Sequence, residues 1–109
     1  MTRKFIHTAS FDRHWKNLGL GDDELHELQN ILLADPQAGD VIQSLAGARK
    51  IRFAANEHGK RGGARVIYVD IVRDEQIYLL TAYPKNAKAD LTSDEKKDLA
   101  KLVKILKSQ

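Results

Sequence analysis

Six basic side chains fall between residues 49 and 65, where Glu57 is the single acidic residue. They are Arg49, Lys50, Arg52, Lys60, Arg61 and Arg65. Arginine guanidinium groups match phosphate oxygens with two parallel hydrogen bonds, and lysine supplies a mobile point charge. Because such clusters create a local positive field even when the net charge is small, this segment predicts binding to a polyanion such as a phosphodiester backbone.

The spacing of these cations indicates how they are presented. Lys50 and Arg52 lie two residues apart in an alternating segment, so on a strand their side chains share one face, about 7 Å apart. Glycines at 59, 62 and 63 flank Lys60 and Arg61 and predict a hairpin tip whose cations meet phosphates first. Arg65 comes after that tip, at the start of an apolar run that predicts a strand. We therefore expect its guanidinium to be held more rigidly than the side chains of Lys60 and Arg61.

Crowded cations could also perform acid–base chemistry. Neighbouring positive charges lower the pKa of a lysine, and a lysine tuned in that way acts as a general base at neutral pH. RNA carries its own nucleophile, the 2′-hydroxyl, so cleavage by such a site needs neither a metal nor a histidine. The alternatives are a surface that only binds RNA and one that merely keeps a sheet face hydrated. Spacing alone favours binding over catalysis, because phosphate contacts demand less geometry.

Other kinds of site lack support in the sequence. The chain has no cysteine, which excludes disulfides and thiolate metal sites and is compatible with a reducing cytoplasm. Its four histidines lack metal-ligand spacing and are interpreted as surface or structural residues. The glycine-rich segment lacks the order of a phosphate-binding loop, and no serine stands in a G-x-S-x-G motif. We therefore expect no metal and no cofactor.

The sequence shows no membrane-spanning or signal segment, which favours a cytoplasmic location. The net charge is only +3 and the pI is near 9.2. No apolar run approaches the length of a membrane span, and the N-terminal segment lacks the apolar core and cleavage site of a signal peptide. We expect a soluble cytoplasmic protein with no membrane partner.

Two hydrophobic periodicities in the sequence predict the strands and helices that position the cations. Alternating or β-branched segments predict strands at residues 4–8, 49–55, 64–72 and 77–83. Apolar residues at helical spacing predict a short helix capped by Ser10, a second from Asp22 to Asp35, and a third that starts with a Thr92–Glu95 capping box. Because these helices are set apart from a run of hairpin-linked strands, the predicted fold class is α+β, in a single domain of residues 1–109. We expect a small twisted antiparallel sheet with helices packed on one face and Lys50 and Arg52 on the free face.

Six short motifs occur in order over residues 39–103, namely GDVI, RKIR, GKRGG-x-RVIY, IYLL, Y-x-KN and DLT. With the preceding LQNILLADP segment, this string closely resembles the RelE/HigB superfamily of bacterial type II toxins, in its HigB-like branch. The resemblance implies the RelE-like toxin fold and a ribosome-dependent endoribonuclease that cuts mRNA in the ribosomal A site without a metal and halts translation. It also implies a cognate antitoxin partner, in this branch often a helix-turn-helix DNA-binding protein.

The resemblance further implies roles for individual residues. Lys50 and Arg52 match two basic sheet positions used for proton abstraction and phosphate binding, and Arg65 matches a strand arginine that stabilises the transition-state charge. Lys60 and Arg61 match the basic hairpin, and Lys85 matches a lysine before the last helix. The candidate catalytic residues are therefore Lys50, Arg52, Arg65, Lys60 and Lys85, and the candidate RNA-binding residues are Arg49, Arg61, Lys88, Tyr83 and Asn86.

The group that protonates the leaving 5′-oxygen stays open. The best-known RelE-type pattern has an arginine directly after the lysine before the last helix and a tyrosine near that helix, where this chain has Asn86 and Thr92. The candidates are Arg65, Lys85, Lys88 and Tyr83, and Tyr83 is equally well explained as a packing residue. The alternative to an enzyme is a non-catalytic RNA- or ribosome-binding module, or an inactive homologue that acts only through its antitoxin.

Overall fold

Five strands form one sheet in the computed structural model, which describes residues 2–54, 63–84 and 91–109. The strands are β1 (Lys4–His7), β2 (Asp40–Val41), β3 (Arg49–Phe53), β4 (Ala64–Ile71) and β5 (Gln76–Pro84). The helices are α1 (Ala9–Asn17), α2 (Asp22–Ala34) and α3 (Ser93–Ser108), and a 3₁₀ turn, η2 (Val72–Asp74), joins β4 to β5. Each predicted strand and helix is present, and β2 is a short strand that the sequence did not predict.

The sheet is mixed, which corrects the expectation of an antiparallel one. Its order is β1-β5-β4-β3-β2, and every pair is antiparallel except β1 with β5, which is parallel. The Thr8 hydroxyl donates to the Leu80 carbonyl oxygen at 2.7 Å and so ties the end of β1 to β5. Because helices and strands separate β1 from β5 along the chain, no hairpin forces these two strands to run in opposite directions. The α+β class itself is confirmed.

Strand β4 is buried on both faces of the sheet. Val66, Ile67, Tyr68 and Val69 each have at most 1% of their surface exposed. Successive residues of a strand point to opposite faces, so four consecutive buried residues need a covering layer on each side. The core therefore consists of two apolar clusters with the sheet between them.

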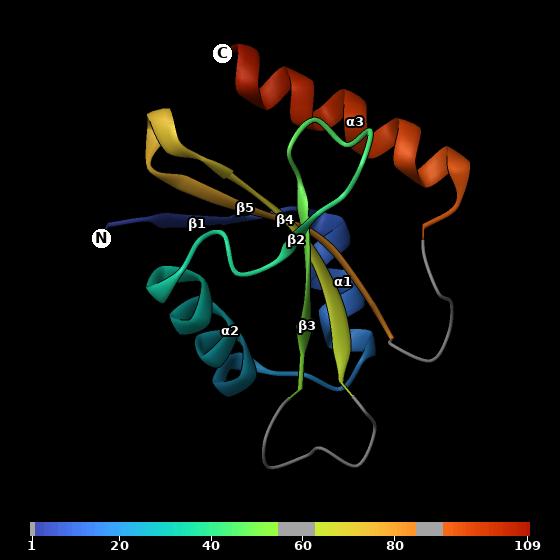
Figure 1. Cartoon of the computed structure of the whole chain (residues 1–109). Helices are drawn as coiled ribbons and strands as arrows, with labels where there is room; N and C mark the ends of the chain where they lie inside the picture. Colours follow the sequence, from blue (N-terminus) through green and yellow to red (C-terminus); the bar gives the residue numbers. More distant parts are fainter. Residues whose placement is uncertain (1, 55–62, 85–90) are drawn as a thin grey trace.

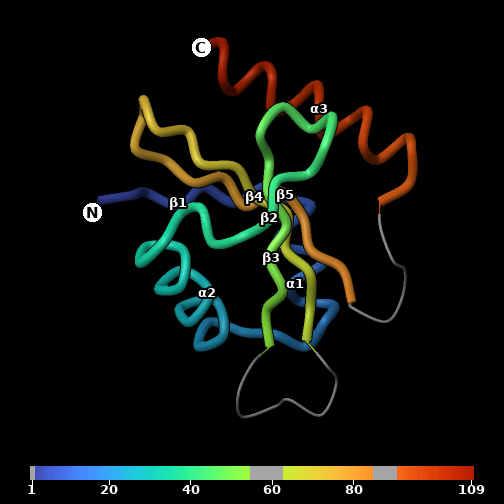
Figure 2. Tube along the Cα trace, in the orientation of Figure 1, coloured from blue at the N-terminus to red at the C-terminus, as the bar shows by residue number. Residues whose placement is uncertain are grey.

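The helices supply these two layers, so the expectation of a single covered face is wrong. Helices α1 and α2 pack on one face with Val66 and Tyr68, and α3 packs on the other with Ile67 and Val69. Figure 1 shows α2 and α3 on opposite sides of the strands. The chain trace in Figure 2 shows β3, β4 and β5 running beside one another between them. The single-face expectation fails because the apolar run of β4 fills both faces.

Side chains near the first residues of α1 and α3 set where these helices begin. Helix α1 begins after Thr8, whose hydroxyl accepts a hydrogen bond from a backbone N–H of the first turn at 3.0 Å. The predicted cap, Ser10, lies inside the helix, with its hydroxyl 3.3 Å from that of Thr81 on β5. The predicted capping box of α3 is confirmed, because Glu95 N donates to Thr92 Oγ1 at 3.2 Å and Thr92 N donates to Glu95 Oε1 at 2.8 Å.

A buried tyrosine ties the loop before β3 to the sheet. The fully buried Tyr68 donates its hydroxyl proton to the Pro36 carbonyl oxygen and accepts from Gly39 N, both at 2.9 Å. A Cβ at position 39 would come within 2.8 Å of the Lys50 carbonyl oxygen, so this close approach requires glycine. Burial raises the pKa of the Tyr68 phenol and keeps its hydroxyl neutral and able to donate. The anchored loop leads directly into β3, which carries Lys50 and Arg52.

Replacing Tyr68 by phenylalanine tests this anchor. Tyr68→Phe leaves a buried N–H and a buried carbonyl oxygen without their partner, so we expect the free energy of unfolding to fall by about 1–3 kcal/mol. Urea denaturation followed by far-UV circular dichroism measures the change. Tyr78→Phe is the matched control, because the Tyr78 hydroxyl bonds Gln76 at 3.2 Å in a partly exposed position and its loss should cost less. Equal losses in the two variants would contradict the anchoring role.

Candidate RNA-binding face

The strand cations share the face of the sheet on which α3 packs. Arg52 is directly opposite Arg65 in the β3–β4 pair, and Lys50 is opposite Ile67. Directly opposed residues point to the same face. Since Ile67 belongs to the apolar cluster beneath α3, the side chains of Lys50, Arg52 and Arg65 all lie on that face.

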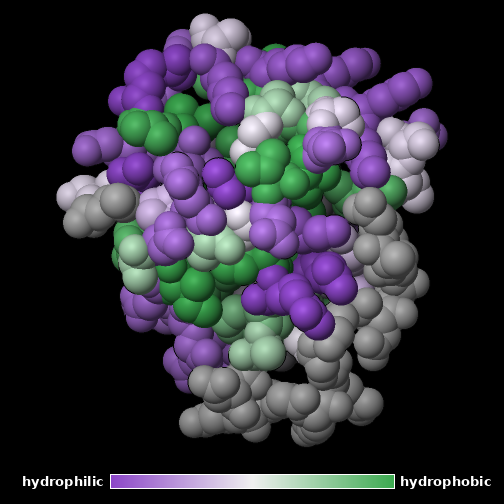
Figure 3. Space-filling model, viewed as in Figure 1, coloured by the Kyte–Doolittle hydropathy of each residue, from purple (hydrophilic) through white to green (hydrophobic). Residues whose placement is uncertain are grey.

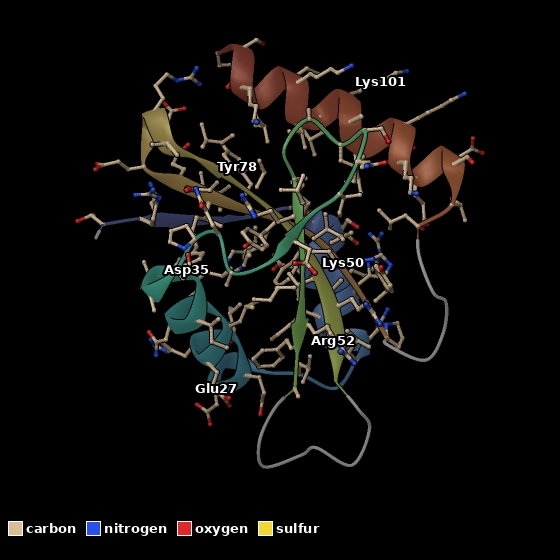
Figure 4. All side chains as sticks on the ribbon, viewed as in Figure 1. Glu27, Asp35, Lys50, Arg52, Tyr78 and Lys101 are labelled. Carbon is tan, nitrogen blue, oxygen red and sulfur yellow. The ribbon has the colours of Figure 1, made fainter. Side chains whose placement is uncertain are left out.

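This face of the sheet divides into an apolar half and a cationic half. The cluster beneath α3 covers β4 over residues 67–71. Toward the start of β4 the same face carries Arg65, which is half-buried, and Arg52, which is exposed. Figure 4 shows Lys50 and Arg52 along β3, and Figure 3 shows strongly hydrophilic side chains over this part of the surface. We call the surface formed by Lys50, Arg52 and Arg65 the cationic face.

Arg52 and Arg65 place two positive charges opposite each other. Like charges at directly opposed strand positions are destabilising. In the part of the chain that the structure describes, neither guanidinium has a hydrogen bond or an ion pair, and the Nε atom of Arg65 is buried. A buried donor without an acceptor costs about 1–3 kcal/mol. An anion such as a phosphate would supply both the missing acceptor and the countercharge.

Gly63 fixes the entry into β4 that presents Arg65. Its φ of +82° lies in the left-handed region, and a Cβ at this position would collide with the Phe53 carbonyl oxygen. Glycine avoids both penalties, since it has no side chain to strain or to clash. The start of β4 therefore lies close against the end of β3, and this packing sets Arg65 opposite Arg52.

Two other candidates have different surroundings. Arg49 is opposite Tyr68 in the register and so lies on the other face, where its Nη1 donates to the Gly39 carbonyl oxygen at 2.8 Å. Its guanidinium supports the loop before β3 and does not join the cationic face. Tyr83 is 5% exposed, packs in the apolar cluster beneath α3 and is the register partner of Arg65. The remaining candidates lie outside the described residues; they are Lys60, Arg61, Lys85, Asn86 and Lys88.

The end of β5 brings together polar groups to which sequence reasoning gave no function. The hydroxyls of Ser10 and Thr81 are 3.3 Å apart, and His14 Nδ1 is 3.4 Å from Thr81 Oγ1. Ser10 and His14 lie four residues apart on one face of α1, so their proximity can be predicted from the sequence spacing alone. Their contact with Thr81 joins segments far apart in the chain, so periodicity could not predict it. All three side chains line a cavity that Tyr83 also borders.

Metal-ligating clusters and membrane-spanning helices are absent from the residues that the structure describes. Over residues 2–54, 63–84 and 91–109, no three histidine, aspartate or glutamate side chains are grouped so as to hold a metal ion. Within the same ranges, no helix has the length and apolar character needed to cross a membrane.

Known proteins share both the sequence pattern and the fold. The family model described as the RelE toxin of the RelE / RelB toxin-antitoxin system matches residues 3–109. The fold is similar to that of a mutant of the E. coli toxin RelE solved in the free state, with a TM-score of 0.60 and 15% sequence identity. That match covers 94% of this chain and 98% of the E. coli chain.

These matches define the class of protein as the toxin component of a toxin–antitoxin system. The chain belongs to the RelE toxin family, whose model covers nearly its whole length. The resemblance to the RelE/HigB superfamily is therefore confirmed, while membership of the HigB-like branch stays a prediction.

Removing one of the opposed charges tests the electrostatics of the cationic face. We expect Arg52→Gln to leave the free energy of unfolding unchanged or to raise it by up to about 1 kcal/mol, because a like-charge pair is relieved. Urea denaturation at low and at high salt measures the effect, and salt should diminish it. Lys101→Gln removes the same charge from the exposed outer side of α3 (Figure 4) and is the control. A clear destabilisation specific to Arg52→Gln would mean that Arg52 stabilises the fold.

Proposed function

We propose that the protein is a metal-independent endoribonuclease that cleaves mRNA in the ribosomal A site and thereby inhibits translation. Membership of the RelE toxin family supports this proposal. The observation that carries it is the cationic face, where the buried Nε of Arg65 has no acceptor among the described residues and Arg65 stands opposite Arg52. A phosphodiester bound there would complete the hydrogen bonding of Arg65 and neutralise the opposed charges.

The proposed cleavage uses the 2′-hydroxyl of the RNA as its nucleophile. A general base, Lys50 or Lys60, takes the 2′-hydroxyl proton, and the 2′-oxygen forms a bond to phosphorus. The bond from phosphorus to the 5′-oxygen breaks, and a general acid gives that oxygen a proton. Arg65, Lys85, Lys88 and Tyr83 are the candidates for this acid. The products are a 2′,3′-cyclic phosphate and a 5′-hydroxyl.

Electrostatic stabilisation of the pentacoordinate phosphorus is the largest contribution that we expect from the protein. Arg52 and Arg61 hold the flanking phosphates, and Arg65 counters the extra negative charge that develops in the transition state. Arg65 belongs to β4, which lies between β3 and β5 in the sheet. Its guanidinium is therefore held on a rigid element before the RNA arrives and needs little reorganisation during the reaction.

The biological setting of the proposal follows from the family. The toxin of a toxin–antitoxin system has a cognate antitoxin, and we propose that this partner is a helix-turn-helix DNA-binding protein. The other partners are the ribosome and its mRNA. The toxin acts in the cytoplasm as one domain of residues 1–109, with no cofactor and no membrane partner.

Replacing Arg65 tests the proposed chemistry. Arg65→Ala should relieve the growth arrest that the wild-type toxin causes in bacteria. It should also slow mRNA cleavage in a translating extract by about 10²–10³-fold, the usual effect of removing one donor that stabilises a transition-state oxyanion. Mapping of new 5′ ends within translated reading frames measures the cleavage. The fold should persist, because the described residues give the Arg65 guanidinium no bond to lose.

Lys101→Ala is the control for the loss of one positive charge, since Lys101 is exposed on α3 and lies away from the strands (Figure 4). This variant should arrest growth and cleave mRNA like the wild type. Wild-type protein that leaves translated mRNA intact would contradict the proposal. Salt-sensitive RNA association without new 5′ ends would instead identify a non-catalytic RNA-binding module.

A further inference from the structure

The short strand β2 places an acid at the edge of the cationic face. Asp40 is directly opposite Lys50 in the β2–β3 pair, so both side chains lie on the same face of the sheet. Ile42, two residues after Asp40, packs against the cluster beneath α3, which agrees with this assignment. We propose that Asp40 accepts a hydrogen bond from a ribose 2′-hydroxyl and thereby makes the toxin select RNA over DNA. The inference rests on the proposed function and deepens it, because it names a residue that recognises the sugar of the substrate.

Two hydrogen bonds and a close approach hold the backbone directly before Asp40. Gly39 N donates to the Tyr68 hydroxyl oxygen at 2.9 Å, and the Gly39 carbonyl oxygen accepts from Arg49 Nη1 at 2.8 Å. A Cβ at position 39 would come within 2.8 Å of the Lys50 carbonyl oxygen, so the chain runs close against β3 at this point. These contacts fix the position of Asp40 before a ligand arrives, which a residue that recognises one group of the substrate needs.

The carboxylate of Asp40 is available to a ligand. It is exposed, and in the part of the chain that the structure describes it has no hydrogen bond and no ion pair. An exposed ion pair with a neighbouring lysine would add little to the stability of the fold. A negative charge beside phosphate-binding cations also weakens the attraction of the surface for phosphates. Neither fold stability nor phosphate binding therefore explains an acid at this position.

The chemistry of the RNA backbone identifies the group that this acid suits. Ionised carboxylates only accept hydrogen bonds, so Asp40 needs a donor from the ligand. Phosphate oxygens are acceptors, and the 2′-hydroxyl is the donor of the sugar–phosphate backbone. DNA lacks this hydroxyl, so it offers Asp40 only the repulsion of its phosphates. A carboxylate among phosphate-binding cations therefore favours RNA over DNA.

The position of Asp40 fits contact with a nucleotide beside the one that is cut. Strand β3 lies between β2 and β4, so two strand spacings, about 10 Å, separate the strands of Asp40 and Arg65. Arg52 holds a flanking phosphate in the proposed function, and it lies two residues from Lys50, the partner of Asp40. Because a ribose adjoins each phosphate, Asp40 contacts the ribose of a flanking nucleotide. The 2′-hydroxyl that it binds is therefore not the nucleophile of the reaction.

Binding of short oligonucleotides tests the inference independently of cleavage. The probes are a single-stranded RNA and a DNA of one sequence that contains only adenine and cytosine, so their bases are identical. In fluorescence anisotropy titrations at low salt, the wild type should bind the RNA about tenfold more tightly, the usual effect of one hydrogen bond to a charged group. Asp40→Ala should bring this ratio near one, by weakening RNA binding and by removing a charge that repels DNA. Asp40→Asn keeps an acceptor oxygen and should retain part of the ratio.

Single 2′-deoxy substitutions in the RNA locate the contact. One such substitution should weaken binding to the wild type by about tenfold and leave binding to Asp40→Ala unchanged, which is the coupling expected of two groups in contact. Exchange of the base at the same position should have little effect in either protein. A preference that follows the base and not the sugar would overturn the inference, because Asp40 would then contact a base.

Asp23→Ala is the matched control, because Asp23 is an exposed acid in the first turn of α2, which packs on the other face of the sheet. This variant loses the same charge and should keep the wild-type ratio. Equal affinity of the wild type for RNA and DNA would overturn the inference, as would no measurable binding of either or a ratio that Asp40→Ala leaves unchanged. Since Asp40 is exposed, its replacement should not unfold the protein, and thermal denaturation checks this point.

Cleavage assays separate this inference from the proposed function. If the wild type cuts translated mRNA but its preference for RNA persists in Asp40→Ala, the ribose contact is overturned and the nuclease stands. If the wild type selects RNA through Asp40 but never cuts, the nuclease is overturned and the ribose contact stands. Gel electrophoresis of the RNA after each titration confirms that binding was measured on intact strands.

Discussion

The burial of β4 on both faces is the constraint on which the rest of the structure depends. Four consecutive residues, Val66 to Val69, are almost completely removed from water. Burial of this kind requires α1 and α2 on one side of the sheet and α3 on the other. An unpaired charged group within that double layer would be strongly destabilising. The cations are therefore confined to the start of β4 and the adjoining part of β3, where the cluster beneath α3 ends.

The cationic face combines rigidity with an unfavourable charge arrangement. Gly63 brings β4 against the end of β3, and this geometry opposes Arg65 to Arg52. Such an arrangement contributes little to the stability of the free protein, but it suits the binding of an RNA phosphate that neutralises both groups. Polar sites that oppose stability in the free protein are typical of functional surfaces.

The sequence predicts those features that depend on residues close together in the chain. The capping box of α3 is such a feature, and so is the alternation of β3, in which Ile51 and Phe53 pack in one cluster while Lys50 and Arg52 face the other side. The features that it does not predict depend on distant segments. Thr8 caps α1 in place of Ser10 while also donating to β5, and the guanidinium of Arg49 is engaged by the loop at residues 37–39.

The chemistry of the RNA ends tests the central claim most directly, namely that the cationic face promotes attack by the 2′-hydroxyl. Purified toxin, translating ribosomes and a labelled mRNA would be incubated, and the termini of the fragments identified by their susceptibility to kinase, phosphatase and ligase. The expected upstream fragment ends in a 2′,3′-cyclic phosphate, and the downstream fragment begins with a 5′-hydroxyl. Fragments that end in a 3′-hydroxyl and begin with a 5′-phosphate would contradict the claim, because they require an external water molecule as the nucleophile.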